Sequence, residues 1–210
     1  MQDYSLARRA MIDSQLRPQG VTDRGVLAAM GKVERERFVP EAARPFAYFD
    51  RSIRIGEGRA MMPPAAIGRL LSEVQPRAGE RALVIGAGSG YSASVLAEIG
   101  LQVVALESEG NIATSPAAEG IDTVIGDLSK GWTKGAPYDL ILLDGAVEEV
   151  PAALGKQLAP DGRLAGAIID RGVTRLIVGT YADGAVSWRS IADADVEALP
   201  GFERPRAFSF

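Results

Sequence analysis

The sequence contains no cysteine and no histidine among its 210 residues. Without cysteine, the chain cannot form disulfides, zinc–thiolate sites or thiol nucleophiles. Without histidine, it cannot build a Ser-His-Asp triad, an HExxH metal site or an imidazole proton relay. We therefore predict no metal site, and any chemistry must use carboxylates, hydroxyls, lysine, arginine, backbone dipoles or a cofactor.

Basic residues are also fewer than acidic ones. Lysine and arginine number 23 against 27 aspartates and glutamates, which gives a net charge of −4. Nucleic-acid-binding proteins are usually basic, so nucleic acid is not an expected partner. The longest stretch without a charge, residues 82–97, contains a Gly/Ser turn and is shorter than a membrane span. No apolar segment follows Arg8-Arg9 to suggest an export signal, so we expect a cytoplasmic protein without membrane contact.

The first 75 residues are predicted to form a helical and irregular cap. Apolar residues at helical spacing predict a helix over 3–16 and a second helix that Thr22 caps. The charged run 34–37 is interpreted as a solvated helix end. Residues 38–64 are expected to be irregular, and Pro64 is well placed to open a further helix.

Residues 76–210 are predicted to form an α/β domain that makes one compact unit with this cap. Short apolar runs without strict alternation indicate strands buried on both faces, hence a mainly parallel sheet with helices on each side. The expected strands are 81–85, 102–106, 123–125, 140–143 and 163–169, and the expected helices are 91–99 and 150–158. Two further runs, 176–181 and 185–191, flank Ala182-Asp183-Gly184 and predict a C-terminal antiparallel hairpin.

A glycine-rich segment joins the first of these strands to the helix that follows it. It reads Gly86-Ala87-Gly88-Ser89-Gly90, and Tyr91 comes next. Such a turn lets the backbone approach a ligand, with N–H groups at the start of the helix facing polar or anionic atoms. We take these five residues as candidate cofactor-binding residues. The alternative is a tight strand–helix turn without a ligand.

Two acids follow the next two predicted strands. Glu107 comes 21 residues after Gly86, where adenosine-binding sheets place an acid for the ribose hydroxyls. Asp127 follows the third strand, at the same edge of the sheet, and is a candidate for the adenine edge. The alternative for Asp127 is an N-cap of residues 128–131. Together with the glycine segment, the two acids predict adenosine binding.

The spacing of the glycines favours S-adenosylmethionine as the cofactor. A dinucleotide fingerprint would need a third glycine where this chain has Tyr91, which disfavours NAD. S-adenosylmethionine has no pyrophosphate, and its sulfonium is an activated methyl donor. A carboxylate acceptor is already ionised at neutral pH, so an enzyme need only align the two reactants and exclude water, without histidine.

At this level of detail the chain resembles the protein-L-isoaspartate O-methyltransferases. The resemblance implies a class I methyltransferase (Rossmann-like) fold, S-adenosylmethionine as cofactor, and isoaspartyl-containing proteins or peptides as substrates. The family methylates the α-carboxyl of isoaspartyl residues in protein repair. The stretches that carry the resemblance are 11–23, 26–30, 36–40, 47–50, 55–58, 85–91, Gly126-Asp127, 136–140, Val150-Pro151 and Gln157-Leu158.

The sequence departs from the family pattern on the acceptor side. The family carries a Gln-Thr-Ile-Ser-Gln-Pro run whose serine is its proposed catalytic hydroxyl. Here the run is Arg59-Ala60-Met61-Met62-Pro63-Pro64, so Met62 stands at the serine position and cannot donate a hydrogen bond. Val84 replaces an acid of the first glycine motif, and Leu143-Asp144-Gly145 stands where the family is small and uncharged. The resemblance therefore assigns no catalytic residue.

Four interpretations stay open on the sequence alone. The chain is a methyltransferase on isoaspartate, a methyltransferase of the same fold with another acceptor, or a binding or regulatory protein that keeps the fold without catalysis. The fourth, a nucleotide-dependent oxidoreductase, fits the glycine spacing least well. The sequence makes no prediction about the oligomeric state.

Overall fold

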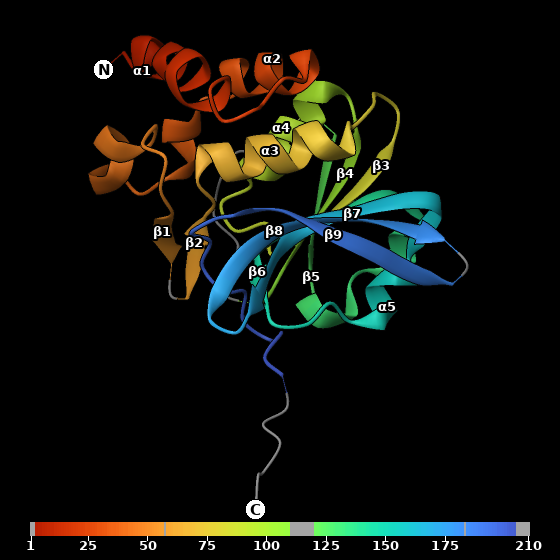
Figure 1. Ribbon diagram of the computed structural model, residues 1–210. Helices are drawn as coiled ribbons and strands as arrows, with labels where there is room; N and C mark the ends of the chain where they lie inside the picture. The colour runs from red at the N-terminus through yellow and green to blue at the C-terminus, as the bar shows by residue number, and fades with distance from the viewer. Residues whose placement is uncertain (1–2, 57, 110–119, 183, 205–210) are drawn as a thin grey trace, which may run out of the picture.

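The computed structural model describes residues 3–56, 58–109, 120–182 and 184–204. Its centre is a seven-stranded sheet with the strand order β5-β4-β3-β6-β7-β8-β9, and a separate two-stranded sheet, β1-β2, lies beside it (Figure 1). The strands are β1 Ile53–Gly56, β2 Arg59–Met61, β3 Arg81–Ile85, β4 Gln102–Glu107, β5 Ile121–Ile125, β6 Tyr138–Val147, β7 Leu158–Asp170, β8 Val173–Ala182 and β9 Ala185–Asp193.

The first five strands of the large sheet, counted from the β5 edge, are parallel. Strand β3 pairs in parallel with β4 and β6, and β7 continues the parallel part beside β6. The last two strands, β8 and β9, form the predicted antiparallel hairpin. The predicted α/β class and its C-terminal hairpin are thus confirmed, although residue 183, in the predicted turn, lies outside the described residues.

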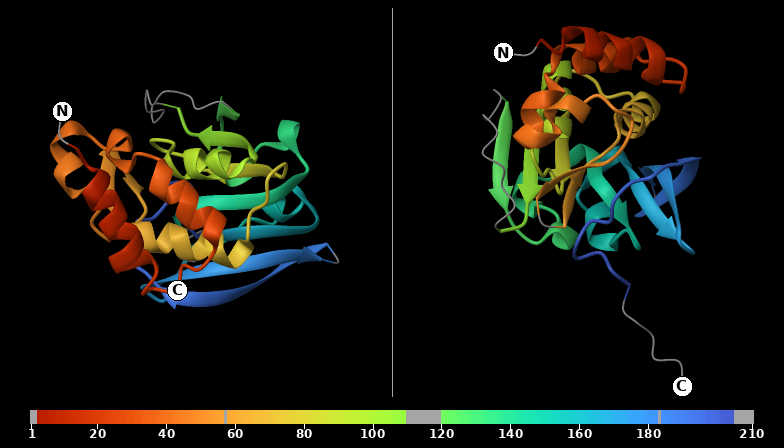
Figure 2. Two further views of the ribbon diagram at one scale, coloured as in Figure 1. Left: turned by 90° about the horizontal axis from the view of Figure 1, so that it is seen from above. Right: turned by 90° about the vertical axis from the view of Figure 1, so that its left-hand side faces the viewer.

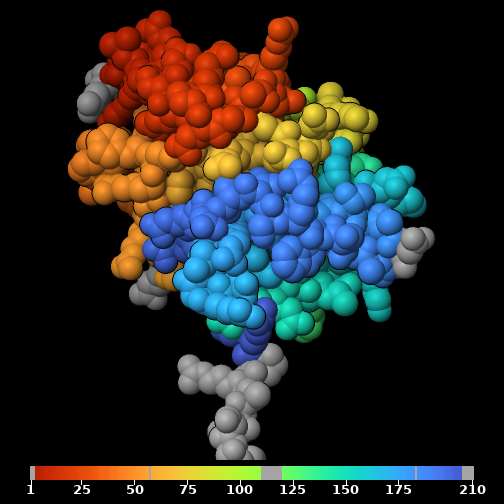
Figure 3. All heavy atoms as spheres, in the orientation of Figure 1, coloured from red at the N-terminus to blue at the C-terminus, as the bar shows by residue number. Residues whose placement is uncertain are grey.

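The helices before β3 all lie on one side of the sheet. They are α1 Ser5–Met11, the π-helix η1 Ile12–Leu16, α2 Arg24–Lys32, the 3-10 helices η2 Arg35–Phe38 and η3 Glu41–Phe46, and α3 Pro64–Val74. Helix α3 packs on β7 and β8, while α2 contacts both α3 and α4, which spans Tyr91–Ile99. Figures 2 and 3 show α1 and α2 (red to orange) stacked on α3 (yellow), with the hairpin (blue) below it.

The parallel strands other than the edge strand β5 bury alternate side chains in two different hydrophobic clusters. Ala82 and Val84 face the helical side, together with α1 to α4. Leu83 and Ile85 face the other side, which is covered by short elements and by the C-terminal residues Leu199 and Phe202. Those short elements are η4 Leu128–Lys130, η5 Thr133–Gly135 and α5 Ala152–Gly155. Because residues 1–75 share a cluster with the sheet, their division from 76–210 stays a prediction.

Several local predictions were wrong. Asp23, not Thr22, caps α2, since its Oδ1 accepts a hydrogen bond from Val26 N at 2.8 Å. The helix predicted over 150–158 is only Ala152–Gly155, because β7 already begins at Leu158. Residues 38–64 are not wholly irregular but contain β1 and β2. Within the described residues, we find no helix long and apolar enough to span a membrane.

The charged run 34–37 is not a solvated helix end. Arg35 is fully buried, and Glu36 pairs with Arg8 at 3.2 Å and accepts a hydrogen bond from the Tyr48 hydroxyl. Only Glu34 and Arg37 keep the exposure that the prediction assigned to the whole run. The run is therefore part of the packing between the cap and the sheet.

Candidate active site

The glycine loop lies where the chain reverses direction across the sheet. From β3 the chain crosses through α4 to β4 and β5, then returns to place β6 on the other side of β3. In open α/β sheets, ligands bind at the carboxyl ends of the strands beside such a switch point. The loop 86–90 follows β3 directly, Glu107 ends β4, and Asp144 lies near the end of β6. The topology thus brings these three elements to one edge.

Glycine is required in the loop by backbone conformation and by close packing. Gly86 and Gly88 have φ angles of 72° and 53°. A Cβ on Gly86 would lie 2.6 Å from Leu199 Cδ2 and 2.8 Å from Arg59 Nη2, and one on Gly88 would lie 2.6 Å from Ile55 Cδ1. Side chains from β1, β2 and the C-terminal segment therefore press against the loop.

The N–H groups of the loop are largely used within the protein. Leu106 O accepts hydrogen bonds from Gly86 N at 2.9 Å and from Ala87 N at 3.1 Å, and Ala87 O accepts one from Gly90 N at 2.8 Å. Gly88 N donates to Glu107 Oε2 at 2.7 Å. Ser89 is buried, with its Oγ 4.0 Å from Met61 Sδ. In this conformation the loop is bound to β4 rather than open to a ligand.

Glu107 is the centre of the site and forms a buried ion pair with Arg59. Both side chains are at most 3% exposed, and Arg59 Nη2 lies 2.9 Å from Glu107 Oε2. The same Nη2 donates to Gly86 O. Glu107 Oε1 accepts from Ser108 N at 2.8 Å and from Ser108 Oγ at 3.1 Å. The carboxylate predicted to bind ribose is thus fully hydrogen-bonded to the protein.

Met62 lies in a buried apolar segment whose backbone is held by Arg35. All four residues from Met61 to Pro64 are buried. Arg35 Nη2 donates to Met62 O at 2.5 Å and Nε donates to Ala47 O at 2.8 Å, while the guanidinium lies 4.6 Å from the centre of the Tyr91 ring. The side chain at the family's serine position is therefore packed in the core, and its backbone is fixed in place.

Three of the buried polar atoms without a hydrogen-bond partner among the described residues belong to Arg35 and to two residues that interact electrostatically with it. They are Arg35 Nη1, the Tyr91 hydroxyl and Asp144 Oδ1. Burial raises the pKa of Asp144 to about 6, although the Ser92 hydroxyl and the Arg59 and Arg35 guanidinium groups act in the opposite direction. Buried groups of this kind usually find partners, so these atoms mark a place where a polar ligand or a side-chain movement can satisfy them.

Asp127 lies apart from this network. Its Oδ1 accepts hydrogen bonds from Ser129 N at 3.0 Å and Ser129 Oγ at 2.7 Å, which makes it the N-cap of η4. Its Oδ2 lies 2.9 Å from Lys130 Nζ, and these hydrogen bonds lower the pKa of its carboxyl group. The structure shows the capping contact, and the contact with adenine stays a prediction.

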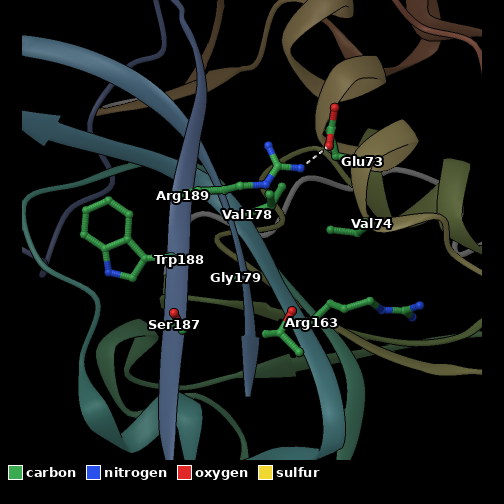
Figure 4. Close-up of a pocket in the computed structure, with 9 residues that line it drawn as sticks. Glu73, Val74, Arg163, Val178, Gly179, Ser187, Trp188 and Arg189 are labelled. Carbon is green, nitrogen blue, oxygen red and sulfur yellow. Dashed lines mark hydrogen bonds and ion pairs between the residues drawn. The ribbon is translucent and has the colours of Figure 1, made fainter. Parts of the chain in front are cut away.

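The cavities that the described residues form away from the glycine loop include the following two. One, of about 290 Å³, lies between β8, β9 and the end of α3, where Arg189 pairs with Glu73 at 2.5 Å (Figure 4). The other, of about 870 Å³, is lined by charged residues of the cap such as Arg8 and Arg44. Neither contains a residue of the loop. In the described part of the chain, no group of acids could hold a metal ion.

The family model for protein-L-isoaspartate(D-aspartate) O-methyltransferases matches residues 7–178. The chain belongs to this family. A protein-L-isoaspartate O-methyltransferase of Rhodopseudomonas palustris (strain HaA2) is 42% identical over 168 residues, which cover 77% of this chain and 69% of the relative. The family catalyses S-adenosylmethionine-dependent methyl transfer to isoaspartyl-containing proteins.

Solved structures of methyltransferases share the fold. A protein-L-isoaspartate O-methyltransferase matches with a TM-score of 0.80 and 22% identity over 93% of this chain and 67% of its own. A Plasmodium falciparum protein described as a β-aspartate methyltransferase, in complex with S-adenosyl-L-homocysteine, matches with a TM-score of 0.77 and 20% identity over 92% of this chain and 98% of its own. At these identities the likeness establishes the α/β methyltransferase fold alone.

Three charged residues of this protein-L-isoaspartate O-methyltransferase family member are not predicted as site residues from the sequence. Arg59 and Asp144 stand out only as departures from the family pattern, and the charged run predicts a solvated Arg35. The available signal was a charge beside an apolar stretch: Arg59 precedes Ala60-Met61-Met62-Pro63-Pro64, and Asp144 follows Leu140-Ile141-Leu142-Leu143. Both charged residues are buried together with most of the apolar residues next to them.

Proposed function

We propose that this chain methylates the α-carboxyl group of isoaspartyl residues in proteins, with S-adenosylmethionine bound at the carboxyl ends of β3 and β4. Its membership of the family carries this proposal, since the family model covers residues 7–178. Isoaspartyl residues arise by damage to aspartate and asparagine, so the proposed cellular role is protein repair, in the cytoplasm. Both the role and the location are inferences from the family's substrate.

The donor types in the site fit the cofactor, provided that one side chain moves. Glu107 ends the strand next to the glycine loop, the place from which an acid binds ribose hydroxyls. Gly86-Ala87-Gly88-Ser89-Gly90 would line the cofactor site, and Asp127 would contact the adenine. When bound, the cofactor supplies a methyl group on a positively charged sulfur. Arg59 now lies on Glu107 and must leave it before ribose binds.

The side chains of this site would act on the acceptor by orientation and by exclusion of water. An α-carboxylate is ionised at neutral pH and needs no general base, which suits a site without histidine. The buried segment Met61 to Pro64, fixed by Arg35, would keep water out but offers the acceptor no side-chain hydrogen bond. Turnover is therefore expected to be low.

A second candidate function is that of a regulatory protein that keeps the fold, with no methyl transfer. The observation that favours it is the burial of Met62 at the serine position. In that case Met61 to Pro64 is an apolar plug that closes the acceptor channel. A methyltransferase with a different acceptor is the remaining alternative, and it would share the cofactor site.

A methyl-transfer assay on an isoaspartyl peptide separates the isoaspartyl methyltransferase from the other two candidates. We expect wild-type activity that is low but measurable, and Met62→Ser should raise turnover about tenfold if one hydrogen bond forms only in the transition state. Met61→Ser, which changes the adjacent buried methionine, is the matched control and should bring no gain. The corresponding aspartyl peptide controls for the substrate. If both wild type and Met62→Ser bind S-adenosylhomocysteine yet transfer no methyl group, the proposed isoaspartyl activity is wrong, and the regulatory protein and the methyltransferase with another acceptor are left.

A further inference from the structure

The guanidinium group of Arg59 lies where the glycine loop and the acid of β4 meet. It donates to Gly86 O and to Glu107 Oε2, with Nη2 at 2.9 Å and Nε at 3.3 Å from that carboxylate oxygen. It is so close to the loop that a Cβ on Gly86 would lie 2.8 Å from Nη2. One cation therefore contacts both elements that the cofactor is expected to contact.

Glu107 has no acceptor capacity left while Arg59 is in place. Its Oε2 accepts from Gly88 N and Arg59, and its Oε1 accepts from the N–H and hydroxyl of Ser108. A carboxylate offers about four acceptor positions, and these donors fill them. Ribose hydroxyls can thus bind Glu107 only if Arg59 withdraws.

A second buried carboxylate, Asp144, interacts electrostatically with Arg59. Asp144 lies on β6, which contacts β2, the strand that carries Arg59. No donor among the described residues reaches Asp144 Oδ1, although this atom is buried. Arg59 is close enough to lower the pKa of Asp144, as are Ser92 and Arg35, whereas Glu107 and burial raise it. A buried carboxylate oxygen without a donor is unfavourable, so Asp144 Oδ1 can accept a further hydrogen bond even though the Ser92 hydroxyl already interacts with the carboxyl group.

We propose that Arg59 is a cofactor gate that exchanges carboxylates. In the free protein it is paired with Glu107 and closes the ribose site. When the cofactor binds, ribose takes Glu107 and Arg59 moves to Asp144. The buried arginine has a carboxylate partner in both states, which avoids leaving an uncompensated charge in the core. This inference rests on the proposed function, because it requires an adenosine-containing ligand at Glu107.

The first test measures the affinity for S-adenosylhomocysteine by calorimetry in wild type and Arg59→Gln. Because the variant frees Glu107 of a charged partner, we expect it to bind about tenfold more tightly. Arg163→Gln is the matched control, since it breaks a partly buried ion pair with Glu80 (2.5 Å) away from the loop, and it should leave the affinity unchanged. Equal or weaker binding by Arg59→Gln overturns the gate.

The second test adds Asp144→Asn in both backgrounds. With Arg59 present, the loss of its second partner should weaken ligand binding about fivefold. In the Arg59→Gln background the same substitution should have no effect on ligand affinity, since there is no arginine with which Asp144 could pair. An equal loss in both backgrounds would mean that Asp144 acts on the ligand directly, and the exchange would be wrong.

A measurement on the wild-type protein covers the case in which Arg59→Gln does not fold. If Arg59 moves to Asp144, ligand binding near pH 6 should release about half a proton, because the arriving cation favours the ionised carboxyl. Calorimetry in two buffers of different ionisation enthalpy measures this number, and Asp144→Asn should abolish it. Binding without proton release contradicts the exchange. If neither wild type nor Arg59→Gln binds S-adenosylhomocysteine, the proposed function itself fails, which is a different result from equal affinities.

Discussion

The ion pair between Arg59 and Glu107 decides how single substitutions in this site are to be interpreted. Glu107→Ala would remove the predicted ribose contact, but it would also break the buried ion pair with Arg59, which would then move toward Asp144 or lie without a carboxylate partner. A loss of cofactor affinity in that variant therefore does not isolate the ribose contact. The effect of Glu107 on the ligand is measured cleanly only with Arg59 replaced as well.

Asp127 offers a simpler residue-scale prediction, because its capping role and its proposed adenine contact make different demands. Asparagine caps helices as well as aspartate does, so Asp127→Asn should change the free energy of unfolding by less than about 0.5 kcal/mol. If the carboxylate accepts a hydrogen bond from the adenine amino group, the affinity for S-adenosylhomocysteine should fall several-fold. Denaturant unfolding and calorimetry on the same variant supply both numbers. Unchanged affinity would leave Asp127 as a cap alone.

At the scale of the element, the parallel strands were predictable and the two-stranded sheet β1-β2 was not. Strands such as β3 are continuous apolar runs because both faces are covered, and the sequence shows this directly. Strands β1 and β2 have only four and three residues and follow a proline-containing irregular segment, so they carry no periodic pattern. Their position depends on contacts with distant parts of the chain. Strand β2 of this small sheet nevertheless brings Arg59 to the site.

The junction between β2 and α3 is held by Arg35, so replacing this buried residue of a charged run should have a large effect on stability. Arg35→Ala removes donors from Met62 O and Ala47 O and the contact with the Tyr91 ring. We expect the free energy of unfolding to fall by roughly 2–4 kcal/mol. Arg37→Ala, in the same charged run but exposed, is the matched control and should change it by less than about 0.5 kcal/mol. Chemical denaturation of both variants checks this, and equal effects would contradict the structural role of Arg35.

At the scale of the whole molecule, the candidate site collects charged residues from four distant segments. Arg35 comes from the cap, Arg59 from β2, Glu107 from β4 and Asp144 from β6. The cofactor motif could be predicted because the glycine loop and Glu107 follow successive strands, a local pattern repeated by the topology. The network of buried charged residues around the loop and Glu107 could not be predicted, because the burial of a charge depends on how the cap packs against the sheet. The acceptor side is thus where tertiary contacts, rather than motifs, determine the chemistry.

The burial of Asp144 predicts that this residue contributes to the pH dependence of the protein's stability. Its pKa is about 6 in the folded protein, against an ordinary value of 3.8, so between these pH values the folded state holds a proton that the unfolded state has lost. The contribution of Asp144 to stability is therefore most favourable in acid and falls as the pH rises towards 7. Asp144→Asn should then stabilise the protein at pH 7.5, by roughly 1–3 kcal/mol, and change it little at pH 4. Denaturant unfolding of both proteins at the two pH values measures the difference, with Asp122→Asn, an exposed position on β5, as the control. A stabilisation of the same size at both pH values would show that packing, not ionisation, is responsible.

If the gate is also correct, Asp144→Asn gains stability while its affinity for S-adenosylhomocysteine falls. The reason is that the carboxylate that destabilises the free protein is also the one that receives Arg59 when the ligand binds.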